Sequence, residues 1–123
     1  MEINKITSEI LDSAYKVHSA LGPGLLESAY QACLVYELRN KGLSVEVEKP
    51  LPLIYEEIKM DCGYRLDILV EGIVVIELKS VEHLSDVHTA QILTYMKLSG
   101  CKVGLLLNFF TKSLKHGIKR LAL

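Results

Sequence analysis

Two apolar segments on either side of a short turn constrain the fold of this chain more than any other feature. Residues 63–70 and 73–79 are two strong strand candidates rich in branched apolar side chains, and the turn Glu71-Gly72 lies between them. The apolar faces of the two strands consist of Leu66, Ile68 and Val70, and of Val74, Ile76 and Leu78. Both faces can line one core only if the loop has an odd number of residues or contains a bulge. The pattern therefore predicts a three-residue loop with Gly72 in the left-handed conformation.

The same register gathers charged side chains on the opposite face of this hairpin. It places Asp67 on the face of Glu77 and Lys79, either directly opposite Glu77 or one pair away. Charges in the middle of apolar strands are costly unless they are paired or bind a metal ion, which favours a functional site. The alternative is a solvated face on which Arg65 and Lys79 screen the two carboxylates, as is common in antiparallel sheets. The residues alone support both interpretations equally.

The remaining elements predict a sheet with helices packed on it. Apolar residues recur at helical spacing over residues 5–20, and Gly22-Pro23-Gly24 must end that helix. The other predicted elements are a helix over 25–40, strands over 43–48 and 51–56, a helix over 85–98, a strand over 103–109 and a strand after Lys112. This order predicts an α/β or α+β sandwich.

Composition excludes several classes of protein. The 123 residues have a mass of 13.8 kDa, are 50% hydrophobic and 24% charged, and predict a single folded domain over residues 1–123. Disorder, a disulfide-rich mini-protein and a membrane span of about 18–20 apolar residues are all inconsistent with this sequence. The first residues carry charge where a signal peptide would be apolar. Cys33, Cys62 and Cys101 form no CxxC pair, so we expect buried, reduced thiols in a cytoplasmic protein.

The charge of the chain is divided unevenly along its length. Residues 1–86 hold 15 acidic and 8 basic residues, a balance of −7, whereas residues 87–123 hold 6 basic and no acidic residues, a balance of +6. One end of the molecule could therefore present a positive surface to a polyanion. On charge alone, however, solubilising lysines scattered over several elements are the favoured interpretation.

Two predicted helices carry polar residues at spacings that place them on one face. Glu27 and Tyr30 are three residues apart, and His88, Gln91 and Tyr95 follow at spacings of three and four. Taken singly, each set is explained more simply as a solvent-exposed helix face than as a functional site. His88 is likewise explained more simply as a structural histidine than as a ligand.

Taken together, three motifs resemble one nuclease superfamily. Gly24-Leu-Leu-Glu27-Ser-Ala-Tyr30 is similar to the signature of the GxxExxY family. Asp67, followed after nine residues by Glu77-Leu78-Lys79, resembles the catalytic core of the PD-(D/E)XK nuclease superfamily, in which that family is placed. Gln91-x-x-x-Tyr95 is similar to the QxxxY motif of the RecB-like branch. The resemblance runs from about residue 6 to residue 120, with Leu66 in place of the motif's proline, and implies a restriction-endonuclease-like core with a central mixed β-sheet flanked by helices.

The resemblance also implies a metal site for Mg²⁺ or Mn²⁺. Its expected ligands are the carboxylates of Asp67 and Glu77 and the backbone carbonyl of Leu78, because hard cations prefer a few carboxylate oxygens together with water and phosphate. Glu27 would hold a water or a second ion. Lys79 would orient the attacking water and offset charge on the phosphate.

Further residues would support that site. Gln91 and Tyr95 would position Lys79 or the scissile strand, and Tyr30 and Gly24 would brace Glu27. The expected, weaker contacts to nucleic acid come from Lys115, Lys119 and Arg120.

The resemblance implies a metal-dependent nuclease that acts on DNA or, less favoured, on RNA. The alternative is a weakly active or silent nuclease-fold module that binds nucleic acid or a protein partner. A small-molecule or redox enzyme has little support, because the chain has no glycine-rich phosphate loop and no paired thiols. A small domain with sheet edges is also suited to forming a homodimer, and no membrane partner is expected.

Overall fold

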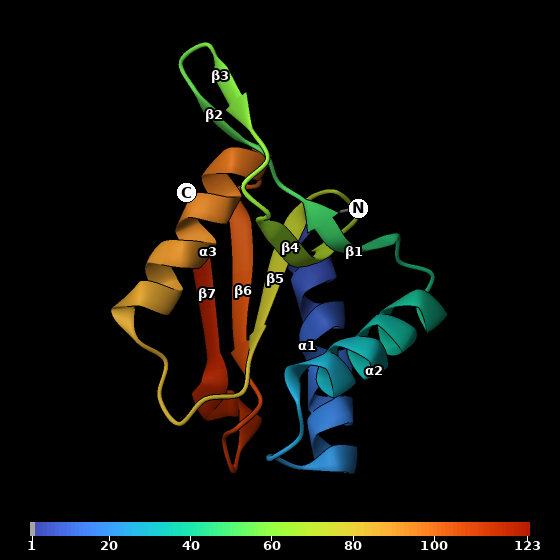
Figure 1. The fold of residues 1–123 in the computed structure, drawn as a ribbon. Helices are drawn as coiled ribbons and strands as arrows, with labels where there is room; N and C mark the ends of the chain where they lie inside the picture. Colours follow the sequence, from blue (N-terminus) through green and yellow to red (C-terminus); the bar gives the residue numbers. More distant parts are fainter. Residues whose placement is uncertain (1) are drawn as a thin grey trace.

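The computed structural model describes residues 2–123 and shows helices on both faces of a central sheet (Figure 1). The helices are α1 (Ile3–Leu21), α2 (Glu27–Asn40) and α3 (Asp86–Ser99), with one 3-10 turn, η1 (Leu114–Gly117). The strands are β1 (Val45–Pro50), β2 (Leu53–Tyr55), β3 (Ile58–Met60), β4 (Arg65–Val70), β5 (Val74–Lys79), β6 (Val103–Asn108) and β7 (Ile118–Ala122).

The main sheet has five strands in the order β1-β4-β5-β6-β7. Only β5 and β6 run parallel, and the other neighbouring pairs are antiparallel, so the sheet is mixed. Helix α3 provides the crossover that joins the parallel strands. The predicted mixed sheet flanked by helices is confirmed.

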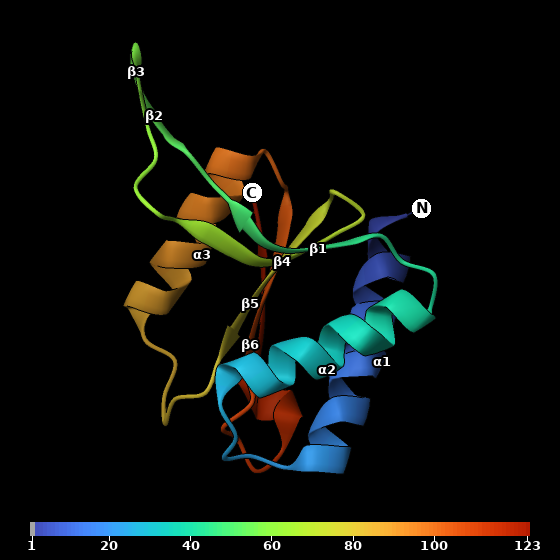
Figure 2. The same cartoon turned by 45° about the vertical axis from the view of Figure 1, so that its right-hand side comes forward.

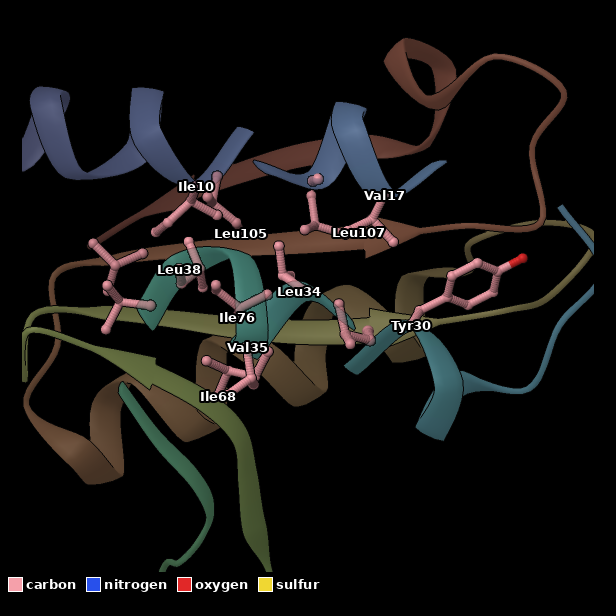
Figure 3. Close-up of a cluster of buried hydrophobic side chains, with 14 of the residues drawn as sticks. Ile10, Val17, Tyr30, Leu34, Val35, Leu38, Ile68, Ile76, Leu105 and Leu107 are labelled. Atoms are coloured by element: carbon pink, nitrogen blue, oxygen red, sulfur yellow. The ribbon is translucent and has the colours of Figure 1, made fainter. Parts of the chain in front are cut away.

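Two hydrophobic clusters fill the space between the sheet and its helices. The first joins α1 and α2 to one face of the sheet, where Ile10 and Leu34 pack with Ile76 and Leu105 (Figure 3). The second joins α3 to the other face and consists of Leu51, Leu66, Leu69, Val75, Ile92, Tyr95, Met96, Cys101 and Leu106. The apolar runs in β5 and β6 are continuous because both strands are covered on both faces.

The hairpin of β4 and β5 has the predicted loop. Val70 pairs with Val74 across three loop residues, and Gly72 lies in the left-handed region with a φ of 65°. One prediction about this hairpin is wrong, because Leu66 packs on the α3 side, opposite the side of Ile68. The β1–β4 ladder lacks its pair at Glu48, where β1 has a φ of 51°, so the backbone is distorted next to Leu66.

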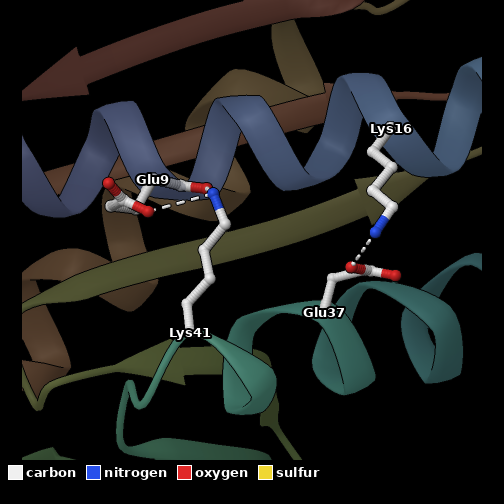
Figure 4. Close-up of polar contacts among 4 residues, drawn as sticks. All are labelled: Glu9, Lys16, Glu37 and Lys41. Carbon is white, nitrogen blue, oxygen red and sulfur yellow. Dashed lines mark hydrogen bonds and ion pairs between the residues drawn. The ribbon is translucent and has the colours of Figure 1, made fainter.

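Two surface ion pairs link α2 to α1 in addition to their apolar contact (Figure 4). Lys16 Nζ lies 2.9 Å from Glu37 Oε1, and Lys41 Nζ lies 3.0 Å from Glu9 Oε2. Exposed pairs of this kind each contribute at most about 1 kcal/mol, so the buried apolar faces remain the main contact. The apolar contact and the ion pairs together hold α2, which begins at Glu27, in place against α1.

A small second sheet was predicted only in part. The segment expected as one edge strand over 51–56 is instead β2, which pairs with β3 to form a hairpin that projects beyond α3 (Figure 1). Its turn, Glu56-Glu57, contains no glycine, although Glu56 has a φ of 51°. The predicted C-terminal strand is confirmed as β7.

The cysteines differ in exposure, and none is in a disulfide. Cys101 is buried and Cys33 is half-buried, but Cys62 is exposed in the segment that returns from the β2–β3 hairpin. The prediction of three buried thiols is therefore wrong for Cys62, because this segment lies outside both hydrophobic clusters. Within residues 2–123, no helix combines the length and the apolar character that crossing a bilayer requires.

Candidate active site

The candidate site lies where β4 and β5 separate. The two strands pair from Val70 and Val74 as far as Ile68 and Ile76, and their ladder then ends. Beyond this point β4 continues along β1 and β5 continues along β6. Figure 2 shows that β4 crosses over β5, and because the pairing of the two strands ends at Ile68 and Ile76, the sheet forms a fork that begins at Asp67 and Glu77.

Side chains replace the missing ladder hydrogen bonds inside this fork. The backbone N–H of Asp67 donates to Glu77 Oε2 at 2.8 Å, and the backbone N–H of Leu78 donates to Asp67 Oδ2 at 2.8 Å. Continuing the register of the hairpin places Asp67 directly opposite Glu77, one of the two predicted arrangements. Each carboxylate is therefore fixed by the main chain of the other strand.

Burial and neighbouring negative charges raise the pKa values of this carboxylate pair. Glu77 is only 4% exposed. Burial, and after it the negative charge of Asp67, raises the pKa of Glu77 to about 8. Burial also raises the pKa of Asp67, against the lowering effect of its hydrogen bond from Leu78. The charge of Lys79 lowers both pKa values but does not offset the burial.

The third motif residue is connected to α3 by a chain of hydrogen bonds. Lys79 Nζ donates to Gln91 Oε1 at 3.2 Å, and Gln91 Nε2 donates to the hydroxyl of Tyr95 at 3.1 Å. Burial, and then the charge of Glu77, raises the pKa of Tyr95. Gln91 thus holds the ammonium of Lys79, and Tyr95 lies within the electrostatic field of the carboxylates.

The backbone at Leu78 adds an oxygen to the fork. The carbonyl of Lys79 accepts from the N–H of Phe109 on the β6 side. Successive residues of a strand direct their backbone groups to opposite sides, so the carbonyl of Leu78 points toward β4, as its N–H does. Two carboxylates with raised pKa values and a carbonyl form an oxygen-only donor set, which suits Mg²⁺ or Mn²⁺. These residues fit a divalent cation.

Glu27 and Glu48 surround the pair without joining it. The negative charges of both raise the pKa of Asp67. Glu27 is exposed at the first turn of α2 and lines a hollow of about 400 Å³ together with Ser80, the residue after Lys79. Across residues 2–123, no three His, Cys, Asp or Glu side chains are grouped closely enough to hold a metal ion together. Asp67 and Glu77 therefore lack a third carboxylate ligand.

Tyr30 and Gly24 act on the loop before α2. The hydroxyl of Tyr30 donates to the carbonyl of Gly22 and accepts from the N–H of Leu25 at 3.0 Å. Its ring stacks on Phe109, with centroids 4.5 Å apart. Gly24 has a φ of 104°, which L side chains rarely adopt. Tyr30 thus fixes the loop that leads into α2, and its recorded hydrogen bonds are to this loop and not to Glu27.

The three basic residues expected to contact nucleic acid are divided between different surfaces. Lys119 donates to Thr89 on α3, whereas Arg120 donates to Asn4 and Thr7 on α1. Successive residues of β7 point to opposite faces of the sheet, so these two side chains cannot form one patch. Lys115 is exposed in η1.

The sequence analysis missed a buried residue that supports the site. Asn108 is 2% exposed and ends β6 beside Lys79. Its Oδ1 accepts from the N–H groups of Val81 and Phe110, and its Nδ2 donates to the carbonyl of Val81 at 2.8 Å. Asn108 thereby fixes the chain as it leaves β5. A single amide at the end of an otherwise apolar strand is the sequence signal that could have identified it.

Comparison with known families agrees with this geometry. A family model described as the PD-(D/E)XK nuclease superfamily matches residues 4–121. This range contains the whole fork and every strand of the main sheet, except for the last residue of β7. Searches of the curated proteins and of the solved structures gave no match. Because the family model covers nearly the whole length, the chain belongs to the PD-(D/E)XK nuclease superfamily.

Proposed function

We propose that residues 1–123 form a single nuclease domain that hydrolyses phosphodiester bonds in DNA with the help of a divalent metal ion. The observation that carries this proposal is the pair of Asp67 and Glu77, fixed by backbone N–H groups in the fork, with Lys79 beside it. The spacing of Gly24, Glu27 and Tyr30 supports membership of the GxxExxY family within the superfamily.

The metal ion, Mg²⁺ or Mn²⁺, would be held by the carboxylates of Asp67 and Glu77 and by the carbonyl of Leu78. When bound, it would supply positive charge at the phosphate and lower the pKa of a water molecule. The raised pKa values of the two carboxylates support this role, because burial and then neighbouring negative charge raise them, and a bound cation would offset both by favouring the ionised forms. Glu27, at the start of α2, would add negative charge beside this site.

Lys79 would contribute a second positive charge on the same face of β5. Its hydrogen bond to Gln91 keeps the ammonium close to the fork, where it would orient the attacking water and stabilise the charge that develops on the phosphate. Tyr95 would in turn hold the amide of Gln91 in the orientation that leaves its oxygen toward Lys79. These two α3 residues would therefore position Lys79 without reacting themselves.

Calorimetric titration of Mn²⁺ into wild type, Glu77→Gln and Glu46→Gln tests the proposal. Glu46 is an exposed glutamate on β1 whose recorded partner is Lys49, so its variant is a matched control. We expect saturable binding to wild type and to Glu46→Gln, and none to Glu77→Gln. Lys79→Ala should bind Mn²⁺ and fail to cleave DNA. Equal Mn²⁺ binding by Glu77→Gln and wild type, or full cleavage by Lys79→Ala, would refute the proposed site.

A further inference from the structure

A groove runs along α3 next to the candidate site. One wall is a stripe of α3 side chains at helical spacing, and the other is the base of the β2–β3 hairpin. The lining residues are Leu53, Tyr64, Val87, Ala90, Gln91, Thr94, Tyr95 and Leu98. The groove encloses about 440 Å³. From residue 87 to residue 98 the helix rises about 16 Å, so the groove extends over three turns.

This groove is continuous with the candidate active site through two side chains. Gln91 lines the groove and also accepts the hydrogen bond of Lys79, so the groove begins one side chain away from that ammonium. Tyr95 lines the groove as well, and burial, followed by the charge of Glu77, raises its pKa. A polymer that placed a phosphate at Lys79 could therefore extend directly along α3.

The chemistry of the groove favours flat, uncharged groups. Among the described residues that line it, none carries a formal charge. Tyr64 is 42% exposed, and its ring centroid lies 6.1 Å from that of Tyr95 at an interplanar angle of 51°. Val87, on the opposite wall, is 74% exposed. These apolar and aromatic surfaces lie open to a ligand.

We propose that this groove holds unpaired bases, so that the protein acts on a single-stranded segment of nucleic acid. This inference rests on the proposed nuclease function and names the form of its substrate. Bases of a single strand can stack on aromatic side chains whatever their identity, and Tyr64 is the ring that the groove exposes most. A duplex keeps its bases stacked inside and presents no free base face to Tyr64, whereas the bases of a single strand can reach this ring.

The test measures binding without cleavage. All variants are made in the Glu77→Gln chain, and fluorescence anisotropy in EDTA follows a labelled oligothymidylate strand and a labelled duplex of the same length. We expect Tyr64→Ala to weaken binding of the single strand about tenfold or more and to leave the duplex unchanged. Tyr64→Phe, which keeps the ring, should bind as the parent does. Tyr36→Ala is the matched control, because Tyr36 is a 63% exposed tyrosine on α2 and does not line the groove.

Three results would overturn this inference. They are unchanged single-strand binding by Tyr64→Ala, an equal loss for single strand and duplex, and a loss in Tyr64→Phe as large as in Tyr64→Ala. Circular dichroism establishes that each variant is folded. The Mn²⁺ titration reports on the nuclease proposal separately. If wild type binds Mn²⁺ and Tyr64→Ala keeps its affinity for the single strand, the base groove is refuted. If wild type does not bind Mn²⁺ and Tyr64→Ala loses affinity for the single strand only, the groove is retained and the metal site is refuted.

Discussion

Replacing Glu77 with Gln should stabilise the metal-free protein above neutral pH. The carboxyl of Glu77 has a pKa of about 8 in the folded chain, against an ordinary value of 4.5. Between these values the folded state binds more protons than the unfolded state, so the stability of wild type falls as the pH rises through that window. Gln keeps an oxygen to accept from the N–H of Asp67 and carries no charge, so the variant should lack the part of this fall that Glu77 causes.

The magnitude follows from the size of the shift. At about 1.4 kcal/mol for each pH unit, a shift from 4.5 to about 8 sets an upper bound of about 5 kcal/mol. Relaxation of the fork around the charged carboxylate lowers this bound, and we expect a gain of about 1–4 kcal/mol at pH 8.5. At pH 4.5 the two proteins should be nearly equal, because both carry a neutral group at this position.

Urea unfolding at pH 4.5, 6.5 and 8.5 in EDTA measures the effect, with Glu46→Gln as the control for a surface glutamate. The reasoning would be refuted if Glu77→Gln were less stable than wild type at pH 8.5, or if wild-type stability did not fall between pH 4.5 and 8.5. Adding Mn²⁺ at pH 8.5 should reverse the order, since only wild type keeps both carboxylate ligands.

Two further substitutions test the surroundings of the site. Asn108→Ala leaves the main chain of Val81 and the N–H of Phe110 without their partner, so urea unfolding should show a loss of about 1–3 kcal/mol and calorimetry weaker Mn²⁺ binding. Stability equal to that of wild type would contradict the role of Asn108. In Gly117→Ala the new methyl group would meet the carbonyl oxygen of Asn108, which should lower stability by about 1–3 kcal/mol, whereas the exposed Lys115→Ala in the same turn should be neutral. A neutral Gly117→Ala would show that this contact can relax freely.

The predicted parts of the fold are those that burial determines. The β4–β5 hairpin followed from the requirement that two apolar faces share one core, which also determined the loop length and placed Asp67 on the face of Glu77, either opposite it or one pair away. The strand β3 was missed because Ile58 and Lys59 are exposed and Met60 is only half-buried, so no buried face marks it. The Glu56-Glu57 turn lacks the glycine that usually marks a hairpin.

Features of the site that depend on tertiary contacts could not be predicted. Glu48 lies in a strand that alternates as if one face were solvated, and its effect on Asp67 arises from the pairing of β1 with β4. The separation of Lys119 from Arg120 requires knowing that residues 118–122 are a strand between two helical layers. Counting charges along the sequence therefore could not predict the effect of Glu48 on Asp67 or the separation of Lys119 from Arg120.

The two carboxylates of the fork serve both the proposed chemistry and the stability of the fold, because they accept backbone hydrogen bonds. Asp67 and Glu77 each accept a main-chain N–H that an unbroken ladder would have satisfied. An alanine at either position would remove the acid and also leave a donor stranded inside the sheet, so a lost activity could not be assigned to either cause. The amide replacements Asn and Gln retain the acceptor, and only they separate the two roles. For the same reason, most other substitutions at these positions would impair both folding and activity. Selection for stability and selection for activity would therefore both act on these two carboxylates.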